Sequence, residues 1–258
     1  MKVTVLGCGS SVGVPAAGGF WGKCNPNNPK NLRTRASILV QHNGYDLLVD
    51  STVDASQQLT KHNQQKIDAM IWTHCHSDHV NGVDDLRVIS YTNQQPVETY
   101  SNETTLTNMN DMHPYLFKTS FGGVYKQFIN PHVMDSENFE VVDIGGMPVQ
   151  TFMQKHANVD SIGFRINDFA YCVDVLDLSD EALEILKGVD TWIVDAASGW
   201  EDSSKTHAHI GKVMEWIDII KPRMTYLTVL NGSLDYEDTE RQLPDHVRLC
   251  YDGLVLEF

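Results

Sequence analysis

Four potential metal ligands stand within six residues of this sequence: His74, His76, Asp78 and His79. Packing alone rarely explains such a group, because each buried polar side chain without a partner costs about 1–3 kcal/mol. Neutral imidazoles and carboxylates suit zinc, manganese or iron, and a catalytic site leaves one coordination position for water. An isolated histidine is usually a residue that titrates in solvent, but four donors at this spacing favour metal binding.

The segment before these residues positions them. Residues 67–73 form an apolar run that predicts a buried strand ending at the first histidine. In a turn after a strand, His74 and His76 project to one side while Cys75 points away. Asp78 and His79 then reach a second position, so one loop can serve two metal ions.

Apolar runs and helical patterns divide the rest of the chain. We expect strands at 3–6, 37–41, 45–49, 69–73, 149–153, 161–166, 170–173, 191–195 and 224–229, and helices at 54–61, 103–112, 179–186 and 207–220. Paired strands early in the chain, and helices alternating with strands later, predict an α/β fold of mixed sheets covered by helices. Two irregular stretches, 13–35 and 115–138, are candidates for a lid or for plain surface connections.

Composition limits the classes of function. The 258 residues are 41% hydrophobic and 21% charged, which predicts one globular domain over 1–258. The 19 basic and 34 acidic residues give a net charge of -15, which disfavours binding of a nucleic-acid polymer. A small anionic substrate remains acceptable where metal ions reverse the local charge.

Cysteine usage and the absence of apolar spans predict a location. The five cysteines are scattered, which favours a reducing cytoplasm over a disulfide framework. Residues 1–7 resemble a strand and not a signal peptide, and no apolar run approaches the roughly 18 residues of a membrane span. We therefore expect a cytoplasmic protein without a membrane partner.

The pattern H-x-H-x-D-H after a strand resembles the signature of the metallo-β-lactamase superfamily. The resemblance implies an αββα four-layer sandwich, in which two mixed sheets pack face to face with helices outside, and two divalent ions (Zn or Mn, or Fe). It implies that His156 is the next metal ligand and Asp174 the carboxylate that bridges both ions. It also implies that Asp50 supports the metal loop. Taken singly, His156 is more readily explained as a surface loop residue and Asp174 as a helix cap, but their order and their positions at strand ends favour metal binding.

Further motifs resemble those of PhnP-type phosphodiesterases. They are GCGSSVGVP at 7–15, WGKC at 21–24, NLRTRAS at 31–37, DDLR at 84–87, THAH at 206–209, LDY at 234–236 and YDG at 251–253. Members of that group hydrolyse cyclic phosphate diesters such as phosphoribosyl 1,2-cyclic phosphate, and some accept 2',3'-cyclic nucleotides. The resemblance therefore implies a phosphodiesterase acting on small cyclic diesters.

The chain departs from the superfamily at a late strand. Relatives place a last metal histidine in a Leu-Thr-His context, whereas Leu227 and Thr228 are followed here by Val229. Two residues further on stands Asn231, whose amide oxygen is a weak donor for zinc. The second metal site is thus weakly filled, completed by Asn231 or water, or absent. With Cys24 alone in the region of the PhnP cysteine cluster, we expect no structural zinc.

The expected mechanism uses hydroxide formed from metal-bound water. Asp78 counts among the catalytic residues because it is a ligand of a metal ion that takes part in the reaction. Arg87 is a candidate phosphate clamp, although an ion pair with Asp84 or Asp85 explains it as well. His209 is the candidate proton donor to the leaving group and His207 a substrate-binding residue, with capping of the following helix as the alternative for both.

Three other functions remain open. A glyoxalase II-like thioester hydrolase uses the same ligand set, and a tRNA 3'-processing nuclease is disfavoured by the negative charge. A metal- or nucleotide-binding protein with impaired catalysis would follow from loss of the late histidine. The expected partner is a small anionic phosphodiester, and a homodimer is an open alternative to a monomer.

Overall fold

The computed structural model describes residues 1–119, 121–124, 126–201 and 204–258, and these form two sheets. In spatial order, the described strands of the first sheet are β14 (Val255–Glu257), β1 (Lys2–Gly7), β2 (Ser37–His42), β3 (Tyr45–Val49), β4 (Ala69–Ile71), β5 (Val97–Ser101) and β6 (Ile129–Val133). The sheet is antiparallel from β14 to β3 and parallel from β3 to β6. The carboxyl ends of β3 and β4 therefore lie at the same edge.

The second sheet is mixed in the same way. Its strands, in spatial order, are β13 (Val247–Leu249), β12 (Met224–Thr228), β11 (Thr191–Asp195), β10 (Phe169–Cys172), β9 (Ser161–Ile166), β8 (Met147–Gln154) and β7 (Val141–Ile144). Pairing is parallel from β10 to β13 and antiparallel from β7 to β10. The ends of β10, β11 and β12 thus share one edge, where side chains for a site can gather.

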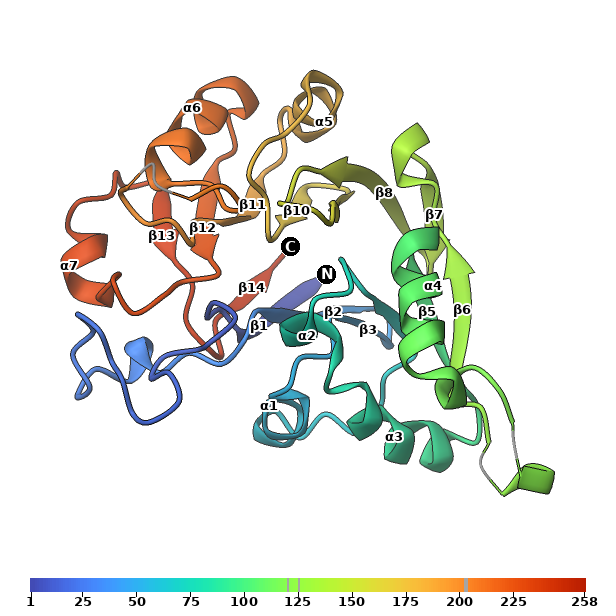
Figure 1. Cartoon of the computed structure of the whole chain (residues 1–258). Coiled ribbons are helices and arrows are strands. Elements are labelled where there is room, and N and C mark those ends of the chain that lie inside the picture. The colour runs from blue at the N-terminus through green and yellow to red at the C-terminus, as the bar shows by residue number, and fades with distance from the viewer. Residues whose placement is uncertain (120, 125, 202–203) are drawn as a thin grey trace.

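Helices cover both outer faces. Around the first sheet lie α1 (Ala55–Lys61), α2 (Ser77–Val80), α3 (Leu86–Asn93) and α4 (Glu103–Met112), and around the second lie α5 (Asp180–Leu186), α6 (Ile210–Ile220) and α7 (Tyr236–Glu240). Figure 1 shows α1 and α3 below the first sheet and α5 and α6 above the second, with the two termini side by side between them. The predicted αββα sandwich of the metallo-β-lactamase type is confirmed.

Alternation along the strands of the first sheet separates two apolar cores. In β3, Leu47 and Val49 belong to the core shared by the two sheets, whereas Leu48 belongs to the core under α1, α3 and α4. In β4, Ile71 and Met70 divide in the same way. Successive side chains of a strand point to opposite faces, so a sheet between two layers must be apolar on both.

Most predicted elements are confirmed within a residue or two. Strands 45–49, 161–166 and 191–195 and helix 103–112 have the predicted bounds. The helix predicted at 207–220 begins instead at Ile210, because the His209 side chain accepts a hydrogen bond from the Lys212 backbone N–H at 3.3 Å and caps it. The sequence missed several elements, among them β6, α2 and α3; α2 has only four residues, and β6 is half exposed and contains a proline.

The two irregular stretches differ. Residues 13–35 contain a single described helical turn, Pro29–Asn31, and lie against the loop that follows β12, where Lys23 N donates to Gly232 O at 2.7 Å. Residues 115–138 include β6, so that expectation is wrong in part, and residues 120 and 125 lie outside the described residues. None of the helices built from described residues has the length and apolarity needed to cross a bilayer.

Candidate metal centre

Asp50, at the end of β3, organises the loop that follows β4. Its Oδ1 accepts hydrogen bonds from the Thr73 backbone N at 2.8 Å, and its Oδ2 accepts from Thr73 Oγ1 at 2.9 Å and His79 Nδ1 at 2.7 Å. Asp50 is 1% exposed, and its backbone has a left-handed φ of 63°. Asp50 therefore lies behind the metal loop and holds it through Thr73 and His79.

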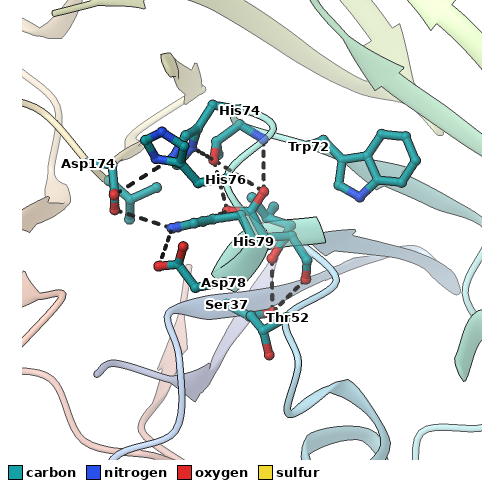
Figure 2. Close-up of polar contacts among 12 residues, drawn as sticks. Ser37, Thr52, Trp72, His74, His76, Asp78, His79 and Asp174 are labelled. Atoms are coloured by element: carbon teal, nitrogen blue, oxygen red, sulfur yellow. Dashed lines mark hydrogen bonds and ion pairs between the residues drawn. The ribbon is translucent and has the colours of Figure 1, made fainter. Parts of the chain in front are cut away.

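Three histidines and one carboxylate turn their ligand atoms toward a common centre. His74 Nε2 lies 3.0 Å from His76 Nδ1 and 3.7 Å from Asp174 Oδ2. His156 Nε2 lies 3.3 Å from both of these partners. Four donors at zinc distances of about 2.0–2.1 Å in a tetrahedron are roughly 3.3–3.4 Å apart, so these distances are close to those of atoms that bind one common ion. Figure 2 shows His74, His76 and Asp174 in this arrangement.

Hydrogen bonds at the second ring nitrogens fix which nitrogen is free to bind a metal. The Thr73 hydroxyl donates to Asp50, so its oxygen accepts from His74 Nδ1 at 3.0 Å, and the neutral His74 ring keeps a lone pair on Nε2. His156 Nδ1 donates to the Thr206 carbonyl at 2.8 Å, with the same consequence. Such outer partners orient metal-binding histidines.

A second group of donors shares Asp174. His79 Nε2 lies 3.3 Å from Asp78 Oδ2 and 3.4 Å from Asp174 Oδ1. Apart from this ion pair with His79, Asp174 Oδ1 is buried and has no hydrogen-bond partner among the described residues. A buried carboxylate oxygen with so few donors is costly, and a cation held by Asp78, His79 and Asp174 would lower that cost. The residues therefore fit the two divalent ions that the resemblance implies, with Asp174 between them.

The charge states match this arrangement. Burial, together with neighbouring histidines, holds the pKa of His74 well below its usual value and lowers that of His76, so both rings are neutral donors. Burial opposes ionisation of Asp174, but the charge of His79 outweighs it and holds the pKa of Asp174 well below the usual range. His79 has a raised pKa because Asp174 and Asp50 outweigh its burial. A divalent ion would take the place of that proton.

A buried carboxylate and a histidine adjoin the cluster. Asp195, at the end of β11, accepts from His207 Nδ1 at 2.7 Å, Val175 N at 3.0 Å and Ala197 N at 2.7 Å. Burial lowers the tendency of His207 to carry a proton, but the charge and hydrogen bond of Asp195 outweigh it and raise the pKa of His207 to about 9. The ring centroids of His207 and His156 are 4.9 Å apart. The cluster therefore has a protonated imidazole at its border.

A polar cavity of about 400 Å³ opens beside His207. Its other lining residues come from the segment 13–35, the loop after β11 and the loop after β12; they are Lys23, Ala197, Ser198, Trp200, Glu201, Ser204, Asn231, Ser233 and Leu234. The Lys23 ammonium and the protonated His207 imidazole outnumber the Glu201 carboxylate on this wall, so the cavity can take an anion although the chain carries a net charge of -15.

Two predicted substrate and catalytic residues have structural partners. The Arg87 guanidinium pairs with Asp84 Oδ1 at 2.5 Å and lies over the rings of Tyr115 and Phe128. It is not among the residues that line the cavity beside His207. His209 caps α6, as described above. Each residue therefore has the structural contact that the sequence left open as an alternative, an ion pair for Arg87 and a helix cap for His209.

Val229 and Asn231 occupy the place of the late histidine. Val229 is 2% exposed and has a left-handed φ of 59°. Asn231 Nδ2 donates to Ala197 O at 2.5 Å, and its Oδ1 accepts from Ser233 N at 2.7 Å. The Asn231 amide thus joins two loops at the cavity wall.

Asp195 and Lys23 are the residues of this region that sequence reasoning missed. Asp195 ends a predicted strand, as Asp50 and Asp174 do, and this repeated position was a usable signal. Lys23 gave no such signal, because its place beside His207 depends on how residues 13–35 fold against the loop after β12.

Comparisons with known proteins agree with this geometry. A sequence model described as a Beta-lactamase superfamily domain matches residues 45–228. The crystal structure of a diphosphatase from the PhnP family has a TM-score of 0.89 and 31% identity, covering 100% of this chain and 98% of that one. Zn²⁺-bound PqqB from Methylobacterium extorquens has a TM-score of 0.79 with full coverage of both chains, and at 20% identity it is similar in fold.

One curated relative is longer than this chain. An octanoyltransferase of Porphyromonas gingivalis (strain ATCC BAA-308 / W83) is 27% identical over 257 residues, covering 98% of this chain and 51% of that protein. The chain therefore spans about half the length of the curated relative that it matches.

Proposed function

This chain belongs to the metallo-β-lactamase superfamily and resembles PhnP, and we propose that it is a metal-dependent hydrolase of small phosphate diesters. Phosphoribosyl 1,2-cyclic phosphate and 2',3'-cyclic nucleotides are the first candidate substrates. The diphosphatase among its relatives adds phosphoanhydrides as a related class.

The observation that carries the proposal is the position of the polar cavity beside the ligand cluster. His207 both lines this cavity and lies within 4.8 Å of Asp174 through their nearest ligand atoms. Lys23 lines the same space. A phosphate ester has compact negative charge and oxygen acceptors, which complement an ammonium group, an imidazolium group and hydroxyls.

Divalent ions held by the two donor groups would lower the pKa of a bound water and offset charge on the phosphate oxygens. The protein itself supplies a proton. His207 Nδ1 donates to Asp195, and a pKa of about 9 keeps Nε2 protonated at neutral pH. From Nε2 the proton passes to the leaving oxygen. We therefore assign to His207 the acid role that the sequence suggested for His209.

Lys23 is assigned to an anionic group of the substrate away from the reacting phosphate. Its backbone N–H donates to Gly232 O at 2.7 Å, which fixes the residue at the cavity wall. An ammonium group on a flexible stem binds phosphate as a point charge. Phosphorylated cyclic diesters would gain more from Lys23 than diesters without a second phosphate.

Hydrolysis of an acyl thioester is the second candidate, favoured by the similarity to a protein named octanoyltransferase. Its match covers half of that protein, so the acyl transfer can belong to the other half. An octanoyl chain needs an apolar channel, whereas seven of the ten lining residues are polar or charged and only Ala197, Trp200 and Leu234 are apolar. We therefore rank phosphate diesters first.

A substrate panel tests the proposal. Purified protein supplied with zinc or manganese is assayed with bis(p-nitrophenyl) phosphate, 2',3'-cyclic AMP, phosphoribosyl 1,2-cyclic phosphate, S-lactoylglutathione and an octanoyl thioester. We expect turnover of the phosphodiesters and loss of both metal and turnover in His76→Ala. Preferential turnover of a thioester would overturn the assignment, and metal binding without any turnover would indicate a binding protein.

A further inference from the structure

The two donor groups differ in chemical type. The group of His74, His76, His156 and Asp174 offers three imidazole nitrogens and one carboxylate oxygen. The group of Asp78, His79 and Asp174 offers one nitrogen and two carboxylate oxygens. Imidazole suits zinc, whereas carboxylate and water suit manganese and magnesium. The first group is therefore a zinc-type site, and the second an oxygen-rich site with fewer protein donors.

Val229 explains why the second group lacks a further nitrogen. In the parallel strands β10, β11 and β12, residues Cys172, Val194 and Leu227 are in register. Asp174 lies two residues beyond Cys172, and Val229 lies two residues beyond Leu227. The two residues are therefore level with each other at the edge of the sheet. Both residues have a left-handed φ, 50° for Asp174 and 59° for Val229. The end of β10 presents the Asp174 carboxylate, whereas the end of β12 presents the Val229 side chain, which cannot bind a metal ion.

Two neighbouring polar side chains, Asn231 and Asp195, are already engaged. Asn231 uses its amide nitrogen for Ala197 O and its oxygen for Ser233 N. Asp195 accepts from two backbone N–H groups as well as from His207. Neither side chain is available to replace the missing donor without breaking these bonds.

We propose that the site formed by Asp78, His79 and Asp174 takes a hard divalent ion together with a phosphate oxygen of the substrate, while the histidine-rich site takes zinc alone. The phosphate part rests on the proposed function. A site with three protein donors has open positions, and a hard ion fills them with oxygen ligands. The second ion and the phosphate then bind cooperatively, and linkage requires each to raise the affinity of the other by the same factor.

The experiment measures metal and phosphate binding rather than turnover. Protein carrying one equivalent of zinc is titrated with Mn²⁺ by calorimetry, with and without inorganic phosphate, and bound Mn²⁺ is followed by electron paramagnetic resonance. We expect phosphate to tighten Mn²⁺ binding by about 5- to 150-fold, the usual range of such coupling, and Mn²⁺ to tighten phosphate binding equally.

Substitutions at one position separate the causes. Val229→His supplies the missing nitrogen, so the second ion should bind without phosphate, with a gain of about 10-fold or more in zinc affinity at that site. Val229→Leu is the matched control, which keeps an aliphatic side chain and should retain the native coupling. Asp78→Asn should lose the second ion and the coupling and keep the first zinc, which provides a test that does not depend on how Val229→His folds.

Several outcomes would overturn the proposal. These are uptake of two zinc ions with equal affinity in the absence of phosphate, Mn²⁺ binding that phosphate leaves unchanged, or Val229→Leu behaving like Val229→His. If the coupling is found but no phosphodiester is hydrolysed, the proposed function fails and this inference stands. If diesters are hydrolysed with one ion and no coupling, the proposed function stands and this inference fails.

Discussion

At the scale of single residues, the site depends on side chains whose second polar atom is already bound. His74, His79 and His156 each use Nδ1 for a threonine hydroxyl, a carboxylate or a carbonyl. This leaves Nε2 directed at the cluster and removes rotational freedom before any ion arrives. Asp195 acts on His207 in the same manner, through one short hydrogen bond and its charge.

The partnership of Asp195 and His207 predicts a pH dependence. An acid must be protonated, so activity should fall as pH rises through the His207 pKa of about 9. Asp195→Asn removes the charge that raises this pKa and leaves the burial that lowers it. The alkaline limb of kcat/KM should therefore move toward or below the ordinary value of 6.5.

The matched variants for this prediction are His207→Gln and His209→Gln. The first should remove the alkaline limb and reduce kcat by about 10²–10⁴-fold, the usual contribution of an acid. The second should keep the limb. A limb that shifts in His209→Gln and stays in Asp195→Asn would return the acid role to His209.

At the scale of elements, the loop after β12 is fixed by residues from the start of the chain. The buried Arg33 guanidinium donates to Leu234 O at 2.7 Å and Asn231 O at 3.1 Å. Asp235 accepts from Asn25 N at 2.9 Å and Asn31 Nδ2 at 2.7 Å while it caps α7. The cavity wall is thus a joint structure of two segments that are about 200 residues apart, as the sequence separations of these bonds show.

We expect Asp235→Ala to lower the free energy of unfolding by about 2–4 kcal/mol, because it removes a cap and bonds to a charged group. The same substitution should raise KM, since the loop that Asp235 fixes carries Asn231 and Ser233, which line the cavity. Ser179→Ala, which removes only the cap of α5, should cost about 1 kcal/mol and leave KM unchanged. Chemical denaturation measures the free energy of unfolding, and steady-state kinetics measures KM. Equal effects of the two variants on KM would contradict the claim that two chain segments form the cavity wall together.

This prediction has a pH signature. Burial opposes ionisation of Asp235, but hydrogen bonds from Asn25, Asp238 and Asn31 outweigh it and lower its pKa. A lowered pKa means that the folded protein holds the ionised form, so the stabilisation is present above the unfolded value of about 3.9 and is lost as pH falls below it. The difference between the native chain and Asp235→Ala should narrow at acid pH.

At the scale of the whole molecule, the metal centre joins two sheets that are otherwise held by apolar packing. The loop after β4 in the first sheet provides His74 and His76, and the ends of β8 and β10 in the second provide His156 and Asp174. The Ile162 N–H also donates to the Thr73 carbonyl at 2.9 Å across the same junction. An ion here binds the folded chain and has no comparable site in the unfolded one.

Removal of metal should therefore lower thermal stability. Ions at about 100 times their Kd stabilise the folded state by about 2.7 kcal/mol. Loss of that energy should lower Tm by roughly 5–10 °C in a chain of this size. Differential scanning fluorimetry with and without a chelator measures the shift, and His76→Ala should show little of it. An unchanged Tm in the native chain would argue against an ion that bridges the sheets.

Local patterns in the sequence predict many of the strands and helices, and they predict the metal loop. Hydrophobic alternation in 45–49 and 161–166, and the helical stripe of α6, are local patterns that fix secondary structure through burial. The motif from His74 to His79 is equally local, since one turn after one strand carries four donors. His156, Asp174 and Asp50 were placed through the order of motifs in a known family, and the structure brings His156 and Asp174 into the cluster with Asp50 behind it.

The roles of the residues around that centre depend on contacts that form in the folded chain. Asp195 holds His207, His209 caps a helix, Arg87 pairs with Asp84, and Lys23 enters the cavity wall. Each outcome depends on contacts between segments or on the competition of nearby partners for one side chain. A linear pattern records which groups are present, but burial, partner geometry and charge appear only when the two sheets close on each other.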